Sequence, residues 1–115
     1  MHRQNDKLQL KNILLTGRIP FKRKLNYDDV SRIITKSELK WNFVNEERSP
    51  SLHTCIQLDP NDKKKTISIS IGISGNVAIT GVKNSKDAYT CYYQAIEDIE
   101  KIVKNIIDKE KITIW

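Results

Sequence analysis

The sequence predicts an α+β domain, in which a curved antiparallel sheet of about five strands carries one short and one long helix on its convex side. Residues 65–83 alternate between apolar and small side chains, as expected of a β-hairpin. Residues 85–107 repeat apolar side chains every three or four positions, as expected of a long helix. Because these apolar faces must be buried together, both helices should cover one side of the sheet and leave the other side uncovered.

The hairpin is the clearest strand signal in the chain. Its inward side is predicted to hold Ile67, Ile69, Ile71, Ile73, Val77 and Ile79. Ser74–Asn76 supplies a turn, since glycine and asparagine tolerate positive φ at little cost. Gly81 is expected to close the second strand. The outward side is unusually smooth, which suits a neighbouring backbone or a closely approaching ligand; it comprises Ser68, Ser70, Gly72, Ala78 and Thr80.

Three further strands and a short helix are expected ahead of the hairpin. The strands are Leu8–Ile19, Leu39–Val44 and Leu52–Leu58, and the helix is Asn26–Lys36, with Asn26 as its N-cap. Pro20 ends the first strand. Trp41 and Phe43 should share one packing face. The basic segment Phe21–Leu25 is interpreted as either a solvated loop or a phosphate contact. Turn-forming residues place a loop at Asp59–Lys65.

The long helix should begin at Asn84 or Ser85, because both residue types are good N-caps. Its apolar stripe consists of Ala88, Cys91, Tyr92, Ala95, Ile96, Ile99, Ile102, Val103, Ile106 and Ile107. The opposite face is expected to be exposed to solvent; it carries Glu97, Asp98, Glu100, Lys101, Lys104 and Asp108. The apolar segment 111–115 is expected to dock on the sheet or on another subunit.

Length and charge set further expectations. A chain of 115 residues suits one domain. We divide it into a flexible N-terminus (residues 1–7), a single lobe (residues 8–108) and a C-terminal tail (residues 109–115). The net charge of +6 favours polyanionic partners such as nucleic acid. Residues 1–40 carry ten Lys or Arg against four Asp or Glu, so the positive charge is concentrated in this part.

Cysteine usage and hydropathy bear on the compartment. Cys55 and Cys91 are the only cysteines and form no CxxC motif, which predicts buried thiols in a reducing compartment, either nucleus or cytoplasm. The first residues lead into no apolar signal-peptide core. No apolar run approaches membrane-spanning length. We therefore expect an intracellular protein without a membrane partner.

Sequence motifs for catalysis and metal binding are absent. The chain has no glycine-rich phosphate loop, nucleophile elbow, HExxH motif or Cys/His zinc spacing. His53 has no neighbouring acid or cysteine constellation, and no pattern brings two acids into one cleft. We expect no enzymatic activity, no cofactor and no metal. The uncovered sheet face is thus the best candidate for function.

The order of elements and the hairpin sequence resemble one lobe of the TATA-box-binding protein family. The family stretch reads roughly hydrophobic-hydrophobic-Phe-x-Ser-Gly-Lys-hydrophobic-x-x-Thr-Gly-Ala-Lys-Ser. Here it stands as Ser70-Ile71-Gly72-Ile73-Ser74-Gly75-Asn76-Val77-Ala78-Ile79-Thr80-Gly81-Val82-Lys83-Asn84-Ser85. The Ser-Gly turn, the Thr-Gly pair and the following lysine match. Upstream, Lys11-Asn12-Ile13-Leu14 resembles the family's Gln-Asn-Ile-Val. The resemblance covers about residues 8–107 and implies a curved five-stranded sheet backed by two helices.

The resemblance also implies a DNA-facing set of residues and a function. Positions that touch minor-groove base edges are matched by Asn12, Leu14, Ala78 and Thr80, and basic positions near phosphates by Arg48 and Lys83. Arg18 shares the concave side by alternation. The implied partners are A·T-rich double-stranded DNA, bound in its minor groove, and transcription-machinery proteins on the helical side. The implied role is in transcription initiation.

Several positions depart from the family pattern. The family kinks DNA by wedging phenylalanine pairs between base steps. Ser49 and Gly72 occupy those positions here, and neither can act as a wedge. Cys55 and Asn76 replace basic residues of the family, and Ser70 replaces the usual leucine. DNA binding should therefore be weaker, less bent or absent.

Three functions remain open from the sequence. The first is a DNA-binding factor of the transcription-initiation type, and the second is a protein-interaction or assembly module that keeps the lobe fold without bending DNA. The third is a substrate-binding lobe fused or bound to a nucleic-acid enzyme. A single lobe also leaves the edge of Leu8–Ile19 open, where the family joins its two lobes. We therefore expect a homodimer, or pairing with a second related lobe, through this strand.

Overall fold

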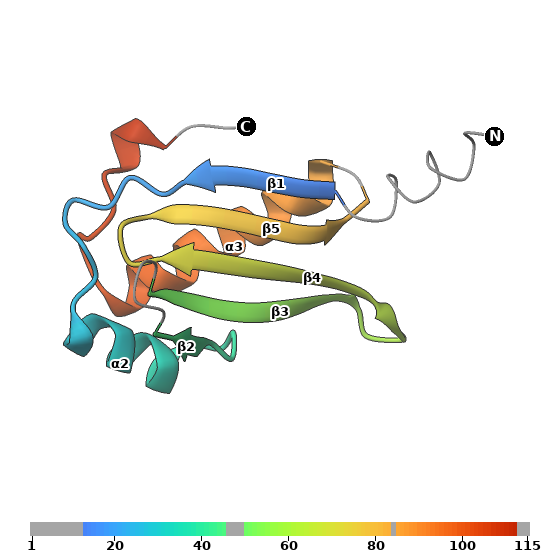
Figure 1. Cartoon of the computed structure of the whole chain (residues 1–115), viewed down its shortest axis with the longest axis horizontal. Helices are drawn as coiled ribbons and strands as arrows, with labels where there is room; N and C mark the ends of the chain where they lie inside the picture. Colours follow the sequence, from blue (N-terminus) through green and yellow to red (C-terminus); the bar gives the residue numbers. More distant parts are fainter. Residues whose placement is uncertain (1–12, 46–49, 84, 113–115) are drawn as a thin grey trace.

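The computed structural model describes residues 13–45, 50–83 and 85–112. In chain order, the elements are β1 (Ile13–Arg18), α2 (Tyr27–Lys36), β2 (Asn42–Val44), β3 (Ser51–Asp59), β4 (Asp62–Gly72), β5 (Asn76–Val82), α3 (Ser85–Ile102) and the short 3₁₀-helix η1 (Lys109–Lys111). The strands form one antiparallel sheet in the order β1-β5-β4-β3-β2 (Figure 1). The sheet does not close, because β1 and β2 form its two edges. The predicted α+β fold class with a five-stranded antiparallel sheet is confirmed.

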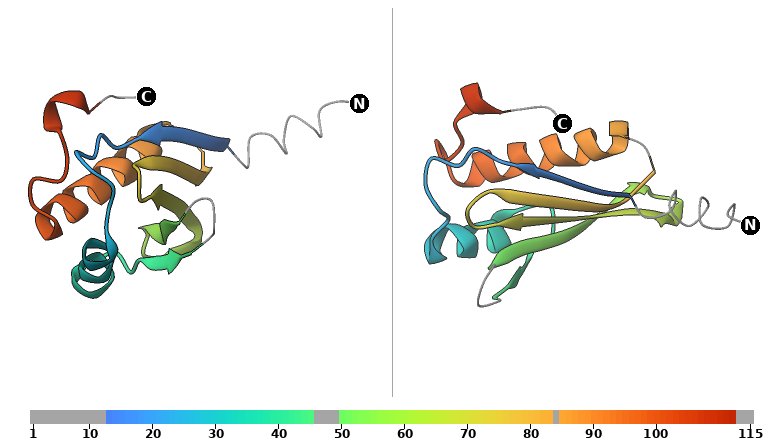
Figure 2. Two further views of the ribbon diagram at one scale, coloured as in Figure 1. Left: turned by 60° about the vertical axis from the view of Figure 1, so that its left-hand side comes forward. Right: turned by 45° about the horizontal axis from the view of Figure 1, so that its top comes forward.

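Both helices lie on the convex side of the curved sheet (Figure 2). Helix α3 packs along β4 and β5, and α2 contacts β2 and α3. The core between the helices and the sheet includes Ile67, Ile69, Ile71, Val77, Ile79, Cys91, Tyr92, Ala95 and Ile99. The inward side predicted for the hairpin is therefore confirmed at these isoleucine and valine positions, while Ile73, in the turn, is only partly buried.

The strands around the hairpin are longer than predicted. A loop was expected at Asp59–Lys65, but the loop contains only Pro60 and Asn61. β3 continues to Asp59, and β4 already begins at Asp62. Likewise, Gly81 does not end β5. Its φ of 83° shifts the register between β5 and β1, so that the following Val82 is also buried.

Helix α2 forms as predicted, whereas the strand expected at Leu39–Val44 is reduced to β2. Asn26 caps α2 in a capping box, in which its side chain accepts a hydrogen bond from the backbone N–H of Asp29 at 2.9 Å. Trp41 is buried ahead of β2. Phe43, which lies on the edge strand, remains 37% exposed.

The long helix ends earlier than its apolar stripe predicts. Helix α3 stops at Ile102, and Asn105 adopts a φ of 63°, which asparagine tolerates better than most residues. The chain then reverses, and Ile107 forms an isolated β-bridge with Phe21. The backbone N–H of Lys22 donates to the carbonyl of Ile106 at 2.7 Å. Ile106 and Ile107 are therefore core residues, as their apolar character indicated, but outside the helix.

Two acids on the outer face of α3 are not simply solvated, in contrast to the prediction. The Asp98 carboxylate accepts hydrogen bonds from the hydroxyl of Ser37 and, at 3.3 Å, from Nε1 of Trp41. The Glu100 carboxylate accepts one from the backbone N–H of Ile107 at 3.4 Å. These carboxylates link α3 to the segments that pack beside it. Of the predicted docking tail, Ile112 packs against the core, and residues 113–115 lie outside the described range.

Within the described ranges, none of the helices combines the length and the apolar character needed to cross a membrane.

Candidate nucleic-acid interface

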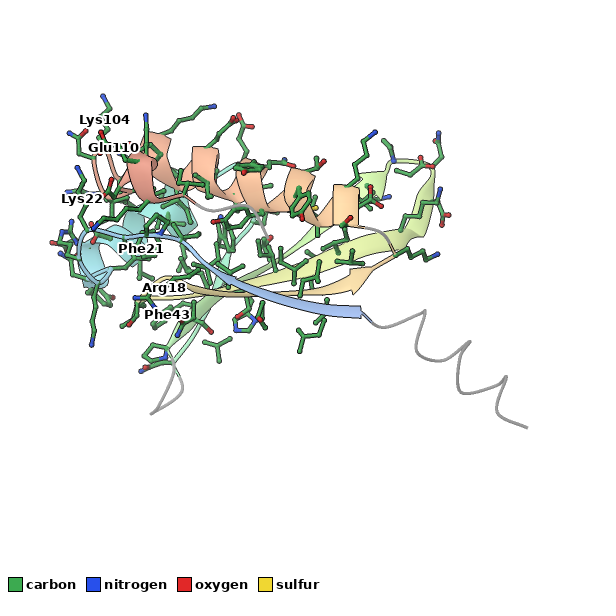
Figure 3. All side chains as sticks on the ribbon, turned by 90° about the horizontal axis from the view of Figure 1, so that it is seen from above. Arg18, Phe21, Lys22, Phe43, Lys104 and Glu110 are labelled. Carbon is green, nitrogen blue, oxygen red and sulfur yellow. The ribbon has the colours of Figure 1, made fainter. Side chains whose placement is uncertain are left out.

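The sheet has one face that no described element covers, and we call it the open face. Figure 3 shows α3 on one side of the sheet and the side chains of the open face on the other. Strand alternation and register bring together on it Leu14, Thr16, Arg18, Asn42, Ser51, His53, Cys55, Gln57, Ser68, Ser70, Gly72, Asn76, Ala78 and Thr80. Most of these side chains are short and polar, so a ligand can come close to the backbone of the central strands.

Two adjoining hollows lie on the open face. The first hollow, of about 650 Å³, extends over β1, β5 and the turn before β3, and Lys24 lies at its rim. The second hollow, of about 520 Å³, extends over β3, β4 and β5, and Lys40 lies at its rim. Ser70 and Ala78 line both hollows, so the two are continuous. Among the described residues that line them are two lysines and no carboxylate, so the surface presented to a ligand is positive.

Hydrogen bonds between side chains order the open face. Arg18 Nη1 donates to Asn76 Oδ1 at 3.0 Å, across the β1–β5 pair. His53 Nε2 lies 2.7 Å from the Ser51 hydroxyl and 3.4 Å from that of Ser70. Within the described part of the chain, His53 thus has serine partners and no carboxylate partner. The His53 ring and the two serine hydroxyls thus form one hydrogen-bonded group on the open face.

The predicted DNA-facing residues have different outcomes. Leu14, Arg18, Ala78 and Thr80 come together on the open face, and Leu14 is 58% exposed. Gly72 also lies there, opposite Ser51. Lys83 is exposed just beyond the end of β5. The predicted positions Asn12, Arg48 and Ser49 lie outside the described residues.

The basic segment Phe21–Leu25 contributes one lysine to the open face, and its arginine has a structural role. Arg23 forms an ion pair with the buried carboxylate of Asp29, which also accepts a hydrogen bond from the backbone N–H of Asn26. The bond from Arg23 lowers the pKa of Asp29 and raises that of Arg23. Lys24 instead lines the first hollow. The sequence predicted either a solvated loop or a phosphate contact for this segment as a whole.

Lys40 and Asn42 are interface candidates that the sequence analysis missed. Both line the second hollow, and Asn42 pairs with His53 across β2 and β3. A signal was available, because side chains that alternate with the apolar Trp41 and Phe43 should point to the opposite side.

The two cysteines differ in environment, so the prediction that both thiols are buried was wrong for Cys55. Its position on the open side of β3 exposes it, and its sulfur lies 3.4 Å from the Ser68 hydroxyl. Cys91 lies in the core, where burial raises the pKa of its thiol to about 11. Within the described residues, no cluster of three or more His, Cys, Asp or Glu side chains could hold a metal ion.

Comparisons with protein-family models, with curated proteins and with solved structures found no match to this chain.

Proposed function

We propose that this chain binds double-stranded DNA by placing its open face in the minor groove, and that it acts in transcription initiation. One observation carries the proposal. The open face contains two adjoining hollows with lysines at their rims and no carboxylate among their described lining residues. Nucleic-acid binding depends largely on neutralising phosphates, and a surface of this charge is suited to it. The net charge of +6 adds a long-range attraction.

The arrangement of elements supports the same proposal. A strand, a helix, four strands and a long helix form a five-stranded sheet with both helices on one side. This is the arrangement that the resemblance to a lobe of the TATA-box-binding protein family implies. Of the residues that the resemblance assigns to DNA contact, Leu14, Ala78 and Thr80 all lie on the open face.

The chemistry of the face suits modest sequence selectivity. Lys24, Lys40 and Arg18 can contact phosphates, which fix the position of a duplex but carry no sequence information. The exposed hydroxyl of Thr80 and the amide of Asn42 can donate to the N3 and O2 acceptors of the minor groove. These acceptors distinguish A·T from G·C pairs and little else. We therefore expect a preference for A·T-rich DNA.

A salt titration with an A·T-rich duplex tests this function. Affinity should fall steeply as salt rises, with a slope that reports the number of phosphates neutralised. Thr80→Val should weaken binding without unfolding the protein. Thr90→Val is the matched control, because Thr90 is exposed on α3, on the helical side. Absence of affinity for any duplex at low salt would contradict the proposal.

A second candidate function is a protein-interaction or assembly module. A hollow of about 390 Å³ lies between α3 and the segment that follows it, and it is lined by Tyr93, Ile96, Ile107 and Ile112. Apolar floors of this kind receive apolar side chains of partner proteins. It also offers a contact for transcription-machinery proteins on the helical side. The same duplex titration decides between the two functions, since a pure interaction module shows no salt-dependent affinity for DNA.

The edge of β1 supports self-association. Within the described part of the chain, β1 pairs only with β5, and the other edge of Ile13–Arg18 has no neighbouring strand. An unpaired edge is a template for another strand. We propose a homodimer, or pairing with a related lobe, through this edge. Light scattering at micromolar concentration should give the mass of a dimer for the isolated protein, and the mass of a monomer would rule out the homodimer.

A further inference from the structure

We infer, on the basis of the proposed DNA binding, that His53 is a further binding residue of the open face and that its protonation couples affinity to pH. Three observations support this role. His53 lies where the two hollows meet, its two ring nitrogens have different hydrogen bonding, and the described residues around it include no carboxylate.

The position of His53 is set by the register of the central strands. It lies on β3, between Asn42 of β2 and Ser70 of β4, and it lines the second hollow. Its Nε2 lies 2.7 Å from the hydroxyl of Ser51, which lines the first hollow, and 3.4 Å from that of Ser70, which lines both. The imidazole therefore lies at the junction of the two hollows, and a ligand that spans them passes over it.

The two ring nitrogens of the half-buried His53 have different surroundings. Nε2 is hydrogen bonded within the protein, whereas no group in the described part of the chain is hydrogen bonded to Nδ1. A neutral imidazole carries one N–H donor, and an imidazolium carries two. Protonation therefore adds a positive charge and lets both nitrogens donate, Nε2 to a serine hydroxyl and Nδ1 to an acceptor of the ligand.

The charged and titratable groups around His53 are few. On the same side of β3 lies Cys55, whose thiol can never carry positive charge, and β4 and β5 contribute no titratable side chain to the described lining of either hollow. Lys40, ahead of β2, and Lys24 are the charged residues of that lining. The segment 46–49, with two glutamates and an arginine, lies outside the described residues. No described carboxylate of the hollows is thus a partner for an imidazolium at position 53.

A bound polyanion supplies the negative charge that the described surroundings of His53 lack. Nearby negative charge favours the protonated form of an imidazole, and histidine is the side-chain type that changes charge between about pH 5 and 8. Binding of DNA should therefore be accompanied by the uptake of a proton at His53. By linkage, the affinity for DNA rises as the pH falls, because the protonated protein binds more tightly than the neutral form.

The test titrates a labelled A·T-rich duplex with the full chain at about pH 7.5 and at about pH 5.5, at one low salt concentration. Carboxylates and lysines ordinarily keep their charge across this range. Linkage to one proton allows at most a tenfold change in affinity per pH unit, so the affinity should be about tenfold higher at the lower pH.

Two variants of His53 and one control make the test specific. His53→Gln cannot gain a charge, so its affinity should be nearly the same at both pH values. His53→Arg is charged throughout, so it should also be insensitive to pH and should bind more tightly than His53→Gln at about pH 7.5. His2→Gln is the control, because His2 is the other histidine of the chain and lies outside the described residues. It should keep the wild-type ratio of affinities, and circular dichroism checks that each variant folds.

The outcomes separate the role of His53 from the proposed function. Equal affinities of the wild type at the two pH values, or the same ratio in His53→Gln as in the wild type, overturn this role and leave DNA binding intact. Loss of the ratio in His2→Gln alone assigns the proton to His2 and likewise overturns it. Failure to bind the duplex at either pH overturns the proposed function and the role of His53 with it.

Discussion

The phenol of Tyr92 donates a hydrogen bond to the backbone carbonyl of Arg18, 3.1 Å away and 74 positions earlier in the chain. Tyr92 lies in the core on α3, and the side chain of Arg18 lies on the open face of β1. Burial raises the pKa of the phenol, so it remains protonated and able to donate at neutral pH. The core of the protein thus holds the strand that carries Arg18 on the open face.

Removing this hydroxyl should reduce stability. Tyr92→Phe keeps the ring and loses the bond to Arg18, which should cost about 1 kcal/mol of unfolding free energy. Urea denaturation measures the effect. Tyr27→Phe serves as the control, because Tyr27 is 85% exposed and its hydroxyl can bond to water. Equal stability of the two variants would show that the bond contributes nothing.

Gly72, at the end of β4, and Gly75, in the turn before β5, should respond differently to substitution by alanine. Gly75 has a φ of 105°, and a Cβ there would lie 2.2 Å from the carbonyl oxygen of Ile19, so Gly75→Ala should cost about 2 kcal/mol or more. Gly72 has no left-handed φ, and a Cβ there would meet its nearest atom at 3.6 Å. Gly72→Ala should therefore change the free energy of unfolding by less than about 0.5 kcal/mol. Urea denaturation of both variants tests the difference. A Gly75→Ala variant as stable as the wild type would contradict the turn geometry.

Asp29 should make stability dependent on pH in acid. The hydrogen bond from Arg23 lowers its pKa in the folded state, so its stabilisation is fully present above the unfolded-state pKa of about 4. This stabilisation is lost as the pH falls through the lower pKa that Asp29 has in the folded state. Asp29→Asn should therefore be less stable at neutral pH and should lose less stability on acidification. Asp28→Asn, an exposed residue in the same helical turn, is the control for charge at the helix N-terminus.

The two lysines at the rims of the hollows should contribute equally to the salt dependence of DNA binding. A plot of log affinity against log salt has a negative slope. Lys24→Gln and Lys40→Gln should each reduce the magnitude of this slope by about one, as expected for one lost phosphate contact. Lys104→Gln is the matched control, because Lys104 lies on the helical side of the molecule (Figure 3). Equal slopes for all three variants would remove the two rim lysines from the interface.

The strands and their faces could be predicted because alternation is a local signal. It placed Ile67, Ile69 and Ile71 in the core and Ser68 and Ser70 on the open face, as observed. The end of the long helix could not be found in this way. Ile106 and Ile107 continue an apolar stripe equally well inside a helix or after a reversal, and no proline or glycine separates them from α3.

The candidate site was predictable only in part, since rim residues depend on tertiary contacts. The positions of Ala78 and Thr80 on the open face could be predicted from strand alternation and from the resemblance to a known family. The choice between Arg23 and Lys24 depends on the capping box of α2, which uses Asp29 and thereby engages Arg23. Lys40 reaches the second hollow because the chain around Trp41 is anchored to α3 through Asp98. Neither relationship is visible in local sequence patterns.

The bridge between Phe21 and Ile107 has a consequence for the order of events during synthesis. β1 leaves the ribosome before the other strands of the sheet, and its pairing partner β5 and the bridge partner of Phe21 are made much later in the chain. Contacts between such distant segments form slowly, because a long loop must be closed first. We expect β1 to remain unpaired until β5 has emerged, and the bridge at Phe21 to form only after Ile107 has emerged. During that interval, its apolar side chains are a natural site for chaperone binding.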